Sequence, residues 1–103
     1  MEIVLLSINK TKNLNLNNLI EDYEKRINYY VKFSSICSNE IKNSKNLSQE
    51  ELKDKEASWI QKNIKKGDLF ILLDKSGISH SSEGFAKFLN KKYNSNYKRI
   101  IFI

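Results

Sequence analysis

Short apolar runs alternate along this chain with segments whose apolar residues recur at helical spacing, and this order most constrains the fold. The apolar runs are residues 3–6, 69–73 and 100–103. A continuous apolar run is typical of a strand that is covered on both faces, because each face then needs apolar side chains. Strands that alternate with helices predict an α/β fold, with a mainly parallel sheet joined by right-handed crossovers.

Three further segments each carry one apolar stripe of the kind found on a helix that packs against a sheet. The stripes lie within residues 16–30, 52–64 and 85–93, where apolar residues recur at steps of three, four or seven. The segments are 15, 13 and 9 residues long, enough for about two to four helical turns. The sequence therefore predicts three helices between the strands.

Capping residues suggest where these helices begin and end. Asn17 or Asn18 is predicted to cap the first helix, and Ser81 or Ser82 the third. A Ser-x-x-Glu capping box at residues 48–51 predicts the start of the second helix. A glycine just past the end of a helix is favoured because it reaches positive φ, so Gly67 is predicted to close the second helix.

Residues 31–37 are rich in β-branched and aromatic side chains and predict one more strand, less buried and at a sheet edge. The first strand is expected to end at residues 9–10, and the polar segment 38–47 is expected to be a loop. The complete order is β-α-β-α-β-α-β, with the second and third buried strands at residues 68–74 and 100–103. We expect one α/β domain over residues 1–103.

The last buried strand coincides with the end of the chain. In open α/β sheets the ligand crevice is built by loops that follow the carboxyl ends of strands. We therefore expect a further segment after Ile103 in the complete protein. An alternative is an oligomeric or swapped assembly, in which another chain covers an exposed last strand.

The charge balance favours a polyanionic partner. Lysine and arginine number 18 against 12 acidic residues, so the net charge is +6 and the pI is about 9.4. Lys87, Lys91 and Lys92 form one group on the third helix, and Lys98 and Arg99 follow closely, which suits contacts with phosphates. The same lysine content also suits an ordinary solvated surface, so both interpretations stay open.

Cysteine use and hydropathy indicate the cellular compartment. Cys37 is the single cysteine, so an internal disulfide is impossible, and no pair of cysteines is available for a structural zinc. No stretch approaches the length of a membrane span, and Met1 leads directly into a short apolar run without a basic leader. We expect a cytoplasmic protein with no membrane partner.

Several kinds of catalytic site lack the residues they need. A phosphoreceiver would need acidic residues after the first strand, where Ser7 stands, and a phosphate-binding loop would need clustered glycines. His80 has no acidic partner or nucleophile at motif spacing, so we interpret it as a solvated loop residue. Cys37 is interpreted as a small half-buried apolar residue. No catalytic side chain and no metal site is predicted.

Three separated segments together resemble one known family. Residues 21–26 (EDYEKR) are similar to its E-Y-x-K-R signature, and residues 53–56 (KDKE) resemble its K-x-K-E sequence. Residues 73–86 (LDKSGISHSSEGFA) match its pattern L-D-x-x-G-x-x-x-S-S-E-x-x-A. The chain thus resembles the amino-terminal portion of the ribosomal RNA large subunit methyltransferase H family, of the SPOUT class.

The resemblance implies a fold, an activity and one site residue. It implies an α/β knot of which this chain would be the amino-terminal part, lacking the knot, and a homodimer in the full-length family. It also implies methylation of N3 of a pseudouridine in 23S large-subunit ribosomal RNA, with S-adenosyl-L-methionine as the cofactor. Leu73 matches a family position that lines the cofactor pocket, and residues 74–77 would shape the same wall.

The resemblance has departures and a competing interpretation. Asn9 and Ala57 stand where the family usually has glycine, and the family's Gly-Gly loop and knot would follow Ile103. We therefore expect the 103-residue chain to be incomplete and inactive alone, because a methyl donor must be oriented from more than one side. The alternative is a non-catalytic, basic α/β module that binds RNA or associates with the ribosome.

Overall fold

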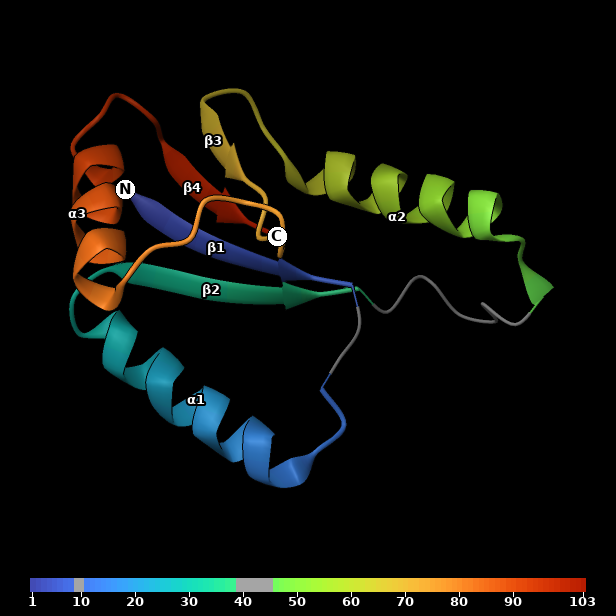
Figure 1. Ribbon diagram of the computed structural model, residues 1–103, viewed down its shortest axis with the longest axis horizontal. Helices are drawn as coiled ribbons and strands as arrows, with labels where there is room; N and C mark the ends of the chain where they lie inside the picture. The colour runs from blue at the N-terminus through green and yellow to red at the C-terminus, as the bar shows by residue number, and fades with distance from the viewer. Residues whose placement is uncertain (9–10, 39–45) are drawn as a thin grey trace.

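The chain folds into a four-stranded sheet with helices on both faces (Figure 1). The computed structural model describes residues 1–8, 11–38 and 46–103. The elements are, in order, β1 (Glu2–Ser7), α1 (Leu14–Asn28), β2 (Lys32–Cys37), α2 (Gln49–Asn63), β3 (Asp68–Ile71), α3 (Ser82–Tyr93) and β4 (Arg99–Phe102). The predicted order of strands and helices is confirmed.

All strand pairs in the sheet are parallel, and the spatial order is β2-β1-β4-β3. The last strand of the chain is therefore an interior strand. Ile101 pairs with Val4 of β1 on one side and with Phe70 of β3 on the other. The idea that β4 is an exposed strand awaiting another chain is wrong, because both of its edges are already hydrogen-bonded.

Alternation along β1 and β4 builds a core on each face of the sheet. On the α2 side, Val4, Leu6 and Ile101 pack with Trp59, which is 5% exposed. On the opposite side, Ile3, Ile100 and Phe102 are buried, and Leu89 of α3 packs against them. Successive residues on one strand thus contribute to two different cores, which is why the sequence shows runs instead of alternation.

Helix α1 covers its face of the sheet loosely. None of its residues is buried, and Leu19, Ile20 and Tyr23 of its apolar stripe are 55%, 41% and 58% exposed. Figure 1 shows α1 at a distance from the sheet except near its carboxyl end, where the chain turns into β2. The stripe predicted from the sequence exists, but this fold leaves most of it uncovered.

The caps agree with the prediction for two helices and differ for the third. Ser48 and Ser81 accept hydrogen bonds from the N–H groups of Glu51 and Gly84, at 3.1 and 3.0 Å. Helix α1 is capped by Asn13, which accepts from Asn15 and Leu16 at 2.9 and 3.2 Å, instead of Asn17 or Asn18. Asparagine fits several positions in this asparagine-rich segment, so composition alone does not select the cap.

The carboxyl end of α2 also differs from the prediction. The helix ends at Asn63 with Ile64 as its C-cap, so Gly67 lies beyond it and is not at C′. Gly67 has φ of +94° and accepts a hydrogen bond from the Lys98 N–H at 2.9 Å, in the turn that leads into β3. Positive φ at this position explains the glycine, although the turn serves the strand and not the helix.

The strand β3 is shorter and more exposed than predicted. It spans four residues, and Phe70, Leu72 and Leu73 are 42%, 62% and 55% exposed. β3 lies at an edge of the sheet, so one of its sides has no neighbouring strand to cover it. The prediction of a fully buried strand over residues 68–74 is therefore wrong, because apolar composition does not show which strand is at the edge.

Some predictions lie outside the described residues. The end of the first strand at Asn9, and most of the loop predicted at residues 38–47, belong to this group. The strand predicted at residues 31–37 is confirmed as the edge strand β2. Among the described helices, none combines the length and apolar character that crossing a membrane requires.

Candidate functional site at the carboxyl ends of β3 and β4

Leu73 lies beside the tip of β4. Its N–H donates to the carbonyl of Ile103 at 2.7 Å, and the Ile103 N–H donates to the carbonyl of Ile71 at 3.0 Å. These bonds continue the pairing of β3 and β4 past the residues assigned to the strands. The two chain segments expected to border one crevice are therefore side by side at the carboxyl edge of a parallel sheet.

The turn after Leu73 is tight and ordered by its own hydrogen bonds. The Gly77 N–H donates to the Asp74 carbonyl at 3.0 Å, and the Ser76 hydroxyl donates to the Asp74 carboxylate at 2.5 Å. A Cβ at residue 77 would lie 3.1 Å from the same carbonyl oxygen, closer than ordinary contact, so glycine fits best there. The predicted turn at residues 75–77 is confirmed, and it presents an exposed rim to solvent.

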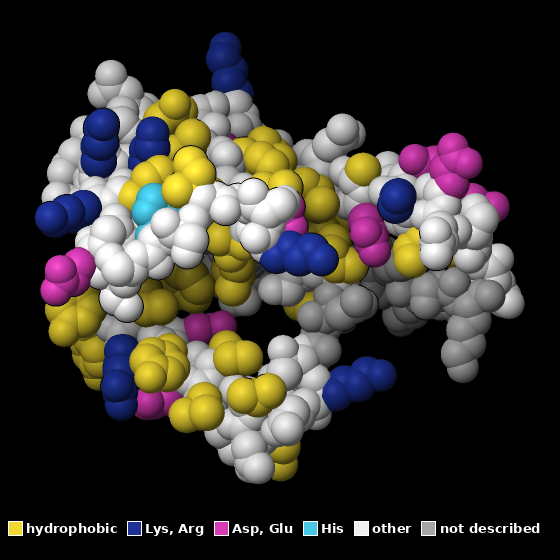
Figure 2. Space-filling view, viewed as in Figure 1, with side chains coloured by type: hydrophobic (Ala, Val, Ile, Leu, Met, Phe, Trp, Pro, Cys, Tyr) yellow, Lys and Arg dark blue, Asp and Glu magenta, His cyan; other side chains and the backbone are white. Residues whose placement is uncertain are grey.

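An apolar groove of about 590 Å³ extends from Leu73 across the sheet between α1 and α3. The floor includes Ile3, Leu5 and Phe102, and the walls include Ile27 of α1 and Leu89 of α3. Figure 2 shows the hollow between α1 and the rest of the molecule, with hydrophobic side chains inside it. Such a lining suits a flat or aliphatic group, and it offers few partners to a charged one.

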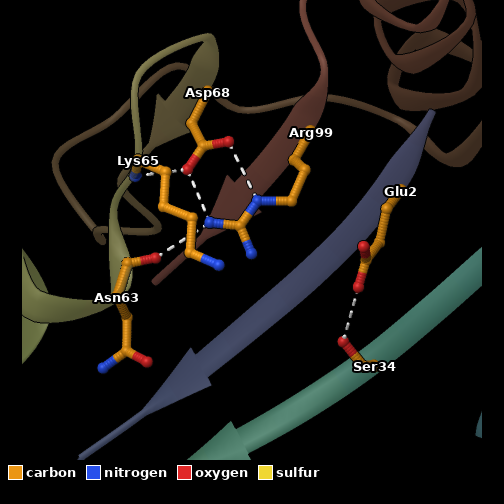
Figure 3. A network of polar contacts seen from close by, with 6 residues as sticks. All are labelled: Glu2, Ser34, Asn63, Lys65, Asp68 and Arg99. Atoms are coloured by element: carbon orange, nitrogen blue, oxygen red, sulfur yellow. Dashed lines mark hydrogen bonds and ion pairs between the residues drawn. The ribbon is translucent and has the colours of Figure 1, made fainter.

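Arg99 does not belong to the basic surface that the sequence suggested. Its guanidinium donates to both carboxylate oxygens of Asp68, at 2.9 and 2.6 Å, and to the carbonyl of Asn63 at 3.0 Å (Figure 3). The Lys65 N–H also donates to Asp68, at 2.7 Å. The side chains of Arg99 and Asp68 are 18% and 2% exposed, so this pair joins β4, β3 and the end of α2 inside the fold.

This ion pair changes the proton affinity of both groups. The hydrogen bonds from Arg99 hold the pKa of the Asp68 carboxyl below its ordinary value, against the opposing effect of burial. The same hydrogen bonds raise the pKa of Arg99. Both residues are thus kept charged by their partner, and their hydrogen bonds link β4, β3 and the end of α2.

His80 is an exposed residue in the loop before α3, as predicted, and it also takes part in an aromatic cluster that the sequence interpretation missed. Its ring centroid lies 5.4 Å from that of Phe88 and 6.3 Å from that of Phe85. The Lys92 ammonium lies over the Phe88 ring, 5.6 Å from its centroid. The spacing of Phe85 and Phe88, three residues apart and just after His80, was the available signal, because such residues share one side of a helix.

The other candidate residues have structural roles. Cys37 is half-buried at the end of β2, as predicted. Within the described part of the chain, no group of three or more His, Cys, Asp or Glu side chains is placed to hold a metal ion. The role of Leu73 in cofactor binding stays a prediction, although its position at the carboxyl edge of the sheet is the one that such a role requires.

Comparison with known proteins identifies the family. The family model described as predicted SPOUT methyltransferase matches residues 1–103. Two proteins named ribosomal RNA large subunit methyltransferase H, from Flavobacterium johnsoniae and Flavobacterium psychrophilum, are 44% and 45% identical over 103 residues. A protein of the same name from Ureaplasma urealyticum is 40% identical over 106 residues.

These matches cover all of the present chain and 66%, 66% and 67% of the three relatives. The chain therefore spans about two thirds of the length of the curated relatives it matches. The all-parallel sheet with three flanking helices agrees with the amino-terminal part of that family's fold. The chain belongs to the SPOUT methyltransferase family, in the group of the ribosomal RNA large subunit methyltransferase H proteins.

Proposed function

We propose that this chain forms one wall of the methyl-donor site of an rRNA methyltransferase, with Leu73 lining the site for S-adenosylmethionine. The observation that supports the proposal is the pairing of Leu73 with Ile103 through a 2.7 Å hydrogen bond. This pairing brings the two strand ends to one edge of a parallel sheet, where open α/β sheets bind their ligands. The hydrogen-bonded turn at residues 74–77 would form the rim.

The residues of this wall fit one part of S-adenosylmethionine. Leu73 is 55% exposed and borders an apolar groove, which suits the flat adenine ring. The groove is apolar apart from Asn90 and the hydroxyls of Tyr30 and Tyr93, so it offers no matched charges for the ammonium and carboxylate of the methionine part. We therefore expect this chain to hold the donor on the adenine side and to bind it weakly by itself.

The reaction proposed is methyl transfer to N3 of a pseudouridine in 23S large-subunit ribosomal RNA. When bound, the cofactor supplies an electrophilic methyl group on a positively charged sulfur. The cofactor would supply this methyl group to the nitrogen, and the proton displaced from the nitrogen would pass to water. The protein's contribution is orientation of the two reactants, so Leu73 and the rim at 74–77 would act by positioning the donor.

Two broader features belong to the same proposal. The curated relatives are named for the large-subunit rRNA, so we propose a cytoplasmic enzyme whose partner is the large ribosomal subunit. Homodimer formation is proposed from the family resemblance. It is supported by the amount of uncovered apolar surface on α1, where Leu14 is 72% exposed. Light scattering on the purified chain would give a mass near 24 kDa, twice 12.1 kDa, if it pairs.

We call Leu73 and residues 74–77 the donor wall. It can be tested by NMR on the ¹⁵N-labelled chain during titration with S-adenosylmethionine. We expect shift changes at Leu73 and residues 74–77, with rapid exchange typical of weak binding. Leu73→Ala should reduce these changes, whereas Leu72→Ala should not, because Leu72 is as exposed but does not line the groove. Changes at the opposite sheet edge, or tight stoichiometric binding by calorimetry, would contradict the proposal.

The alternative of a non-catalytic RNA-binding module makes a different prediction in the same experiment. The chain would then bind RNA in a salt-sensitive way, and S-adenosylmethionine would leave the signals of Leu73 and Ile103 unchanged. A positive donor titration would exclude the non-catalytic interpretation. The uneven charge of the chain favours RNA as the partner under both interpretations, and it leads to the inference below.

A further inference from the structure

The positive charge of the chain is concentrated in its last 29 residues. Residues 75–103 hold six basic side chains and one acidic side chain, so they carry a net charge of +5, whereas residues 1–74 carry +1. Arg99 is neutralised by Asp68. The remaining excess lies on the rim, on α3 and on the segment between α3 and β4. Basic residues occur along the whole chain, but 11 of the 12 acidic residues precede residue 75, so the basic side chains of the last segment have few acidic residues near them in sequence to balance them.

Lys87 and Lys91 of α3 point away from the sheet. Phe85 and Leu89 line the apolar groove, and Lys87 and Lys91 lie roughly 200° around the helix from them, because successive residues are about 100° apart. Both lysines are exposed and make no ion pair within residues 1–8, 11–38 and 46–103. Their charges are therefore available to an external anion.

The rings beside these lysines complete the surface. Phe88 lies between the outer and inner sides of α3, and the Lys92 ammonium rests over the Phe88 ring. His80 packs against Phe88 at 5.4 Å between centroids, and the His80 side chain is otherwise exposed. Figure 2 shows the histidine next to hydrophobic side chains and close to several dark blue Lys or Arg side chains over α3.

We propose that this α3 surface, made of Lys87, Lys91, Lys92, His80 and Phe88, binds single-stranded RNA through its phosphates and one stacked base. The inference rests on the proposed function, because it names the part of the chain that would hold the RNA substrate. Lysines on one helix face can contact successive phosphates. An imidazole ring backed by Phe88 is a firm platform for a base, and stacking of this kind tolerates any base sequence.

The α3 surface shares no residue with the donor wall, but the two are connected through the chain and through the groove. His80 follows the rim at residues 74–77 by three residues, and α3 also supplies a wall of the groove that Leu73 borders. RNA held on the outer side of α3 would thus approach the carboxyl edge of the sheet over the rim. A single-stranded region fits this approach, because its bases are free to stack on a side chain.

The phosphate contacts can be tested with the whole chain and a fluorescein-labelled oligouridylate of twelve nucleotides, without S-adenosylmethionine. Fluorescence anisotropy at several KCl concentrations gives the affinity and its salt slope. Lys87→Gln with Lys91→Gln should weaken binding about tenfold and reduce the salt slope by about 1.4, since each lost contact with a single strand removes about 0.7. The control is Lys53→Gln with Lys55→Gln on α2, which removes the same charge from another exposed site.

The control pair should change the affinity by less than about threefold, because distant exposed charges are screened by salt. Equal losses in both double variants would mean that only net charge matters, and would overturn the proposal. All four lysines are exposed, so the variants should fold, and circular dichroism would verify this.

The base contact is tested by His80→Ala with the same oligonucleotide and with an abasic one of equal length. We expect about a tenfold loss for the oligouridylate, the order typical of one stacked base, and no change for the abasic strand. His80→Tyr keeps a ring and should retain most of the affinity. A loss that is equal for both strands, or no loss for either, would overturn the stacking contact.

A different polyanion would give a different pattern. If phosphatidylserine vesicles bind with the same dependence on Lys87 and Lys91, and His80→Ala has no effect on RNA binding, the surface serves membranes and the proposal is wrong. These measurements do not involve the methyl donor, whereas the titration at Leu73 does not involve RNA. Failure of the α3 surface and failure of the donor wall are therefore seen in separate experiments.

Discussion

At the scale of single residues, the pair formed by Arg99 and Asp68 is the best-connected polar feature of the described structure. It joins two neighbouring strands and the end of α2 through four hydrogen bonds to charged groups (Figure 3). The side chains of Asp68 and Arg99 are 2% and 18% exposed. Removing either one would therefore leave the charge of the other unpaired and poorly solvated. Breaking such a pair costs more than forming it contributes, because the remaining charge is left unpaired.

We expect Asp68→Asn to lower the free energy of unfolding by about 2 kcal/mol at pH 7, the order found for hydrogen bonds to charged groups. Urea unfolding followed by circular dichroism would measure this loss. The control is Asp22→Asn, which removes an exposed ion pair with Arg26. The two charged groups are 3.1 Å apart, and the side chains of Arg26 and Asp22 are 65% and 55% exposed. That change should cost less than about 0.5 kcal/mol. Similar losses in both variants would contradict the importance of the Asp68 site.

The pH dependence of the same variant follows from the lowered pKa of Asp68. Below the unfolded-state value of 3.8 the unfolded chain binds a proton that the folded chain resists until a lower pH. The contribution of Asp68 is therefore fully present above about pH 5 and is lost as the pH falls through its folded-state pKa. Unfolding curves of the chain and of Asp68→Asn should differ at pH 7 and converge at the acid end. A constant difference across this range would argue against the pair as its cause.

At the scale of elements, α2 is attached to the sheet chiefly through Trp59, beside which Ile60 packs against the same core. Trp59 is the buried residue of this helix and packs with Val4, Leu6 and Ile101, while much of the remaining helix extends into solvent (Figure 1). The hydroxyl of Ser48 stabilises its start. A helix of this length is only marginally stable in water without tertiary contacts, so its persistence depends on Trp59.

We expect Trp59→Ala to lower the free energy of unfolding by about 3 to 5 kcal/mol, as is typical when a large buried aromatic side chain is removed. Trp59→Phe should lose much less, since a ring still fills the site. Ile78→Ala is the control for loss of an apolar side chain, because Ile78 is 87% exposed. Chemical denaturation and limited proteolysis of α2 would compare the three. Equal midpoints for Trp59→Ala and Ile78→Ala would refute this role of Trp59.

At the scale of the whole molecule, the two faces of the sheet are covered unequally. The α2 face has a compact buried cluster, whereas the α1 and α3 face retains an open apolar groove of about 590 Å³. A concave apolar groove of this volume is typical of sites that bind ligands. The donor wall borders one end of this groove, and the α3 surface lies on the outer side of one of its walls.

We expect the groove to bind the dye 1-anilinonaphthalene-8-sulfonate with increased fluorescence, because the dye prefers apolar sites shielded from water. Tyr30→Asp should weaken this signal, since Tyr30 lines the groove and a carboxylate would oppose an anionic dye. Tyr29→Asp is the matched control. Tyr29 and Tyr30 are adjacent and are 85% and 87% exposed, but only Tyr30 of the two lines the groove. Equal effects of the two substitutions would show that the dye binds elsewhere. A signal that falls as protein concentration rises would support a second copy covering this face.

Much of the fold follows from local patterns in the sequence. The helical stripes, the Ser48 and Ser81 caps and the apolar runs of β1 and β4 are properties of neighbouring residues, so each could be predicted without knowing the rest of the chain. Their alternation predicts a parallel sheet, because parallel strands need crossovers and helices supply them. The turn after Leu73 is equally local, since Asp74, Ser76 and Gly77 bond to one another.

Only the tertiary structure decided which strands are neighbours, because that choice depends on contacts between residues far apart in sequence. It placed β4 between β1 and β3, which brought Leu73 to Ile103 and left β3 exposed at an edge. It also paired Arg99 with Asp68, 31 residues away, and so removed one charge from the basic surface while Lys87 and Lys91 stayed available. The kinds of elements are thus local properties of this sequence, whereas the site results from long-range packing between them.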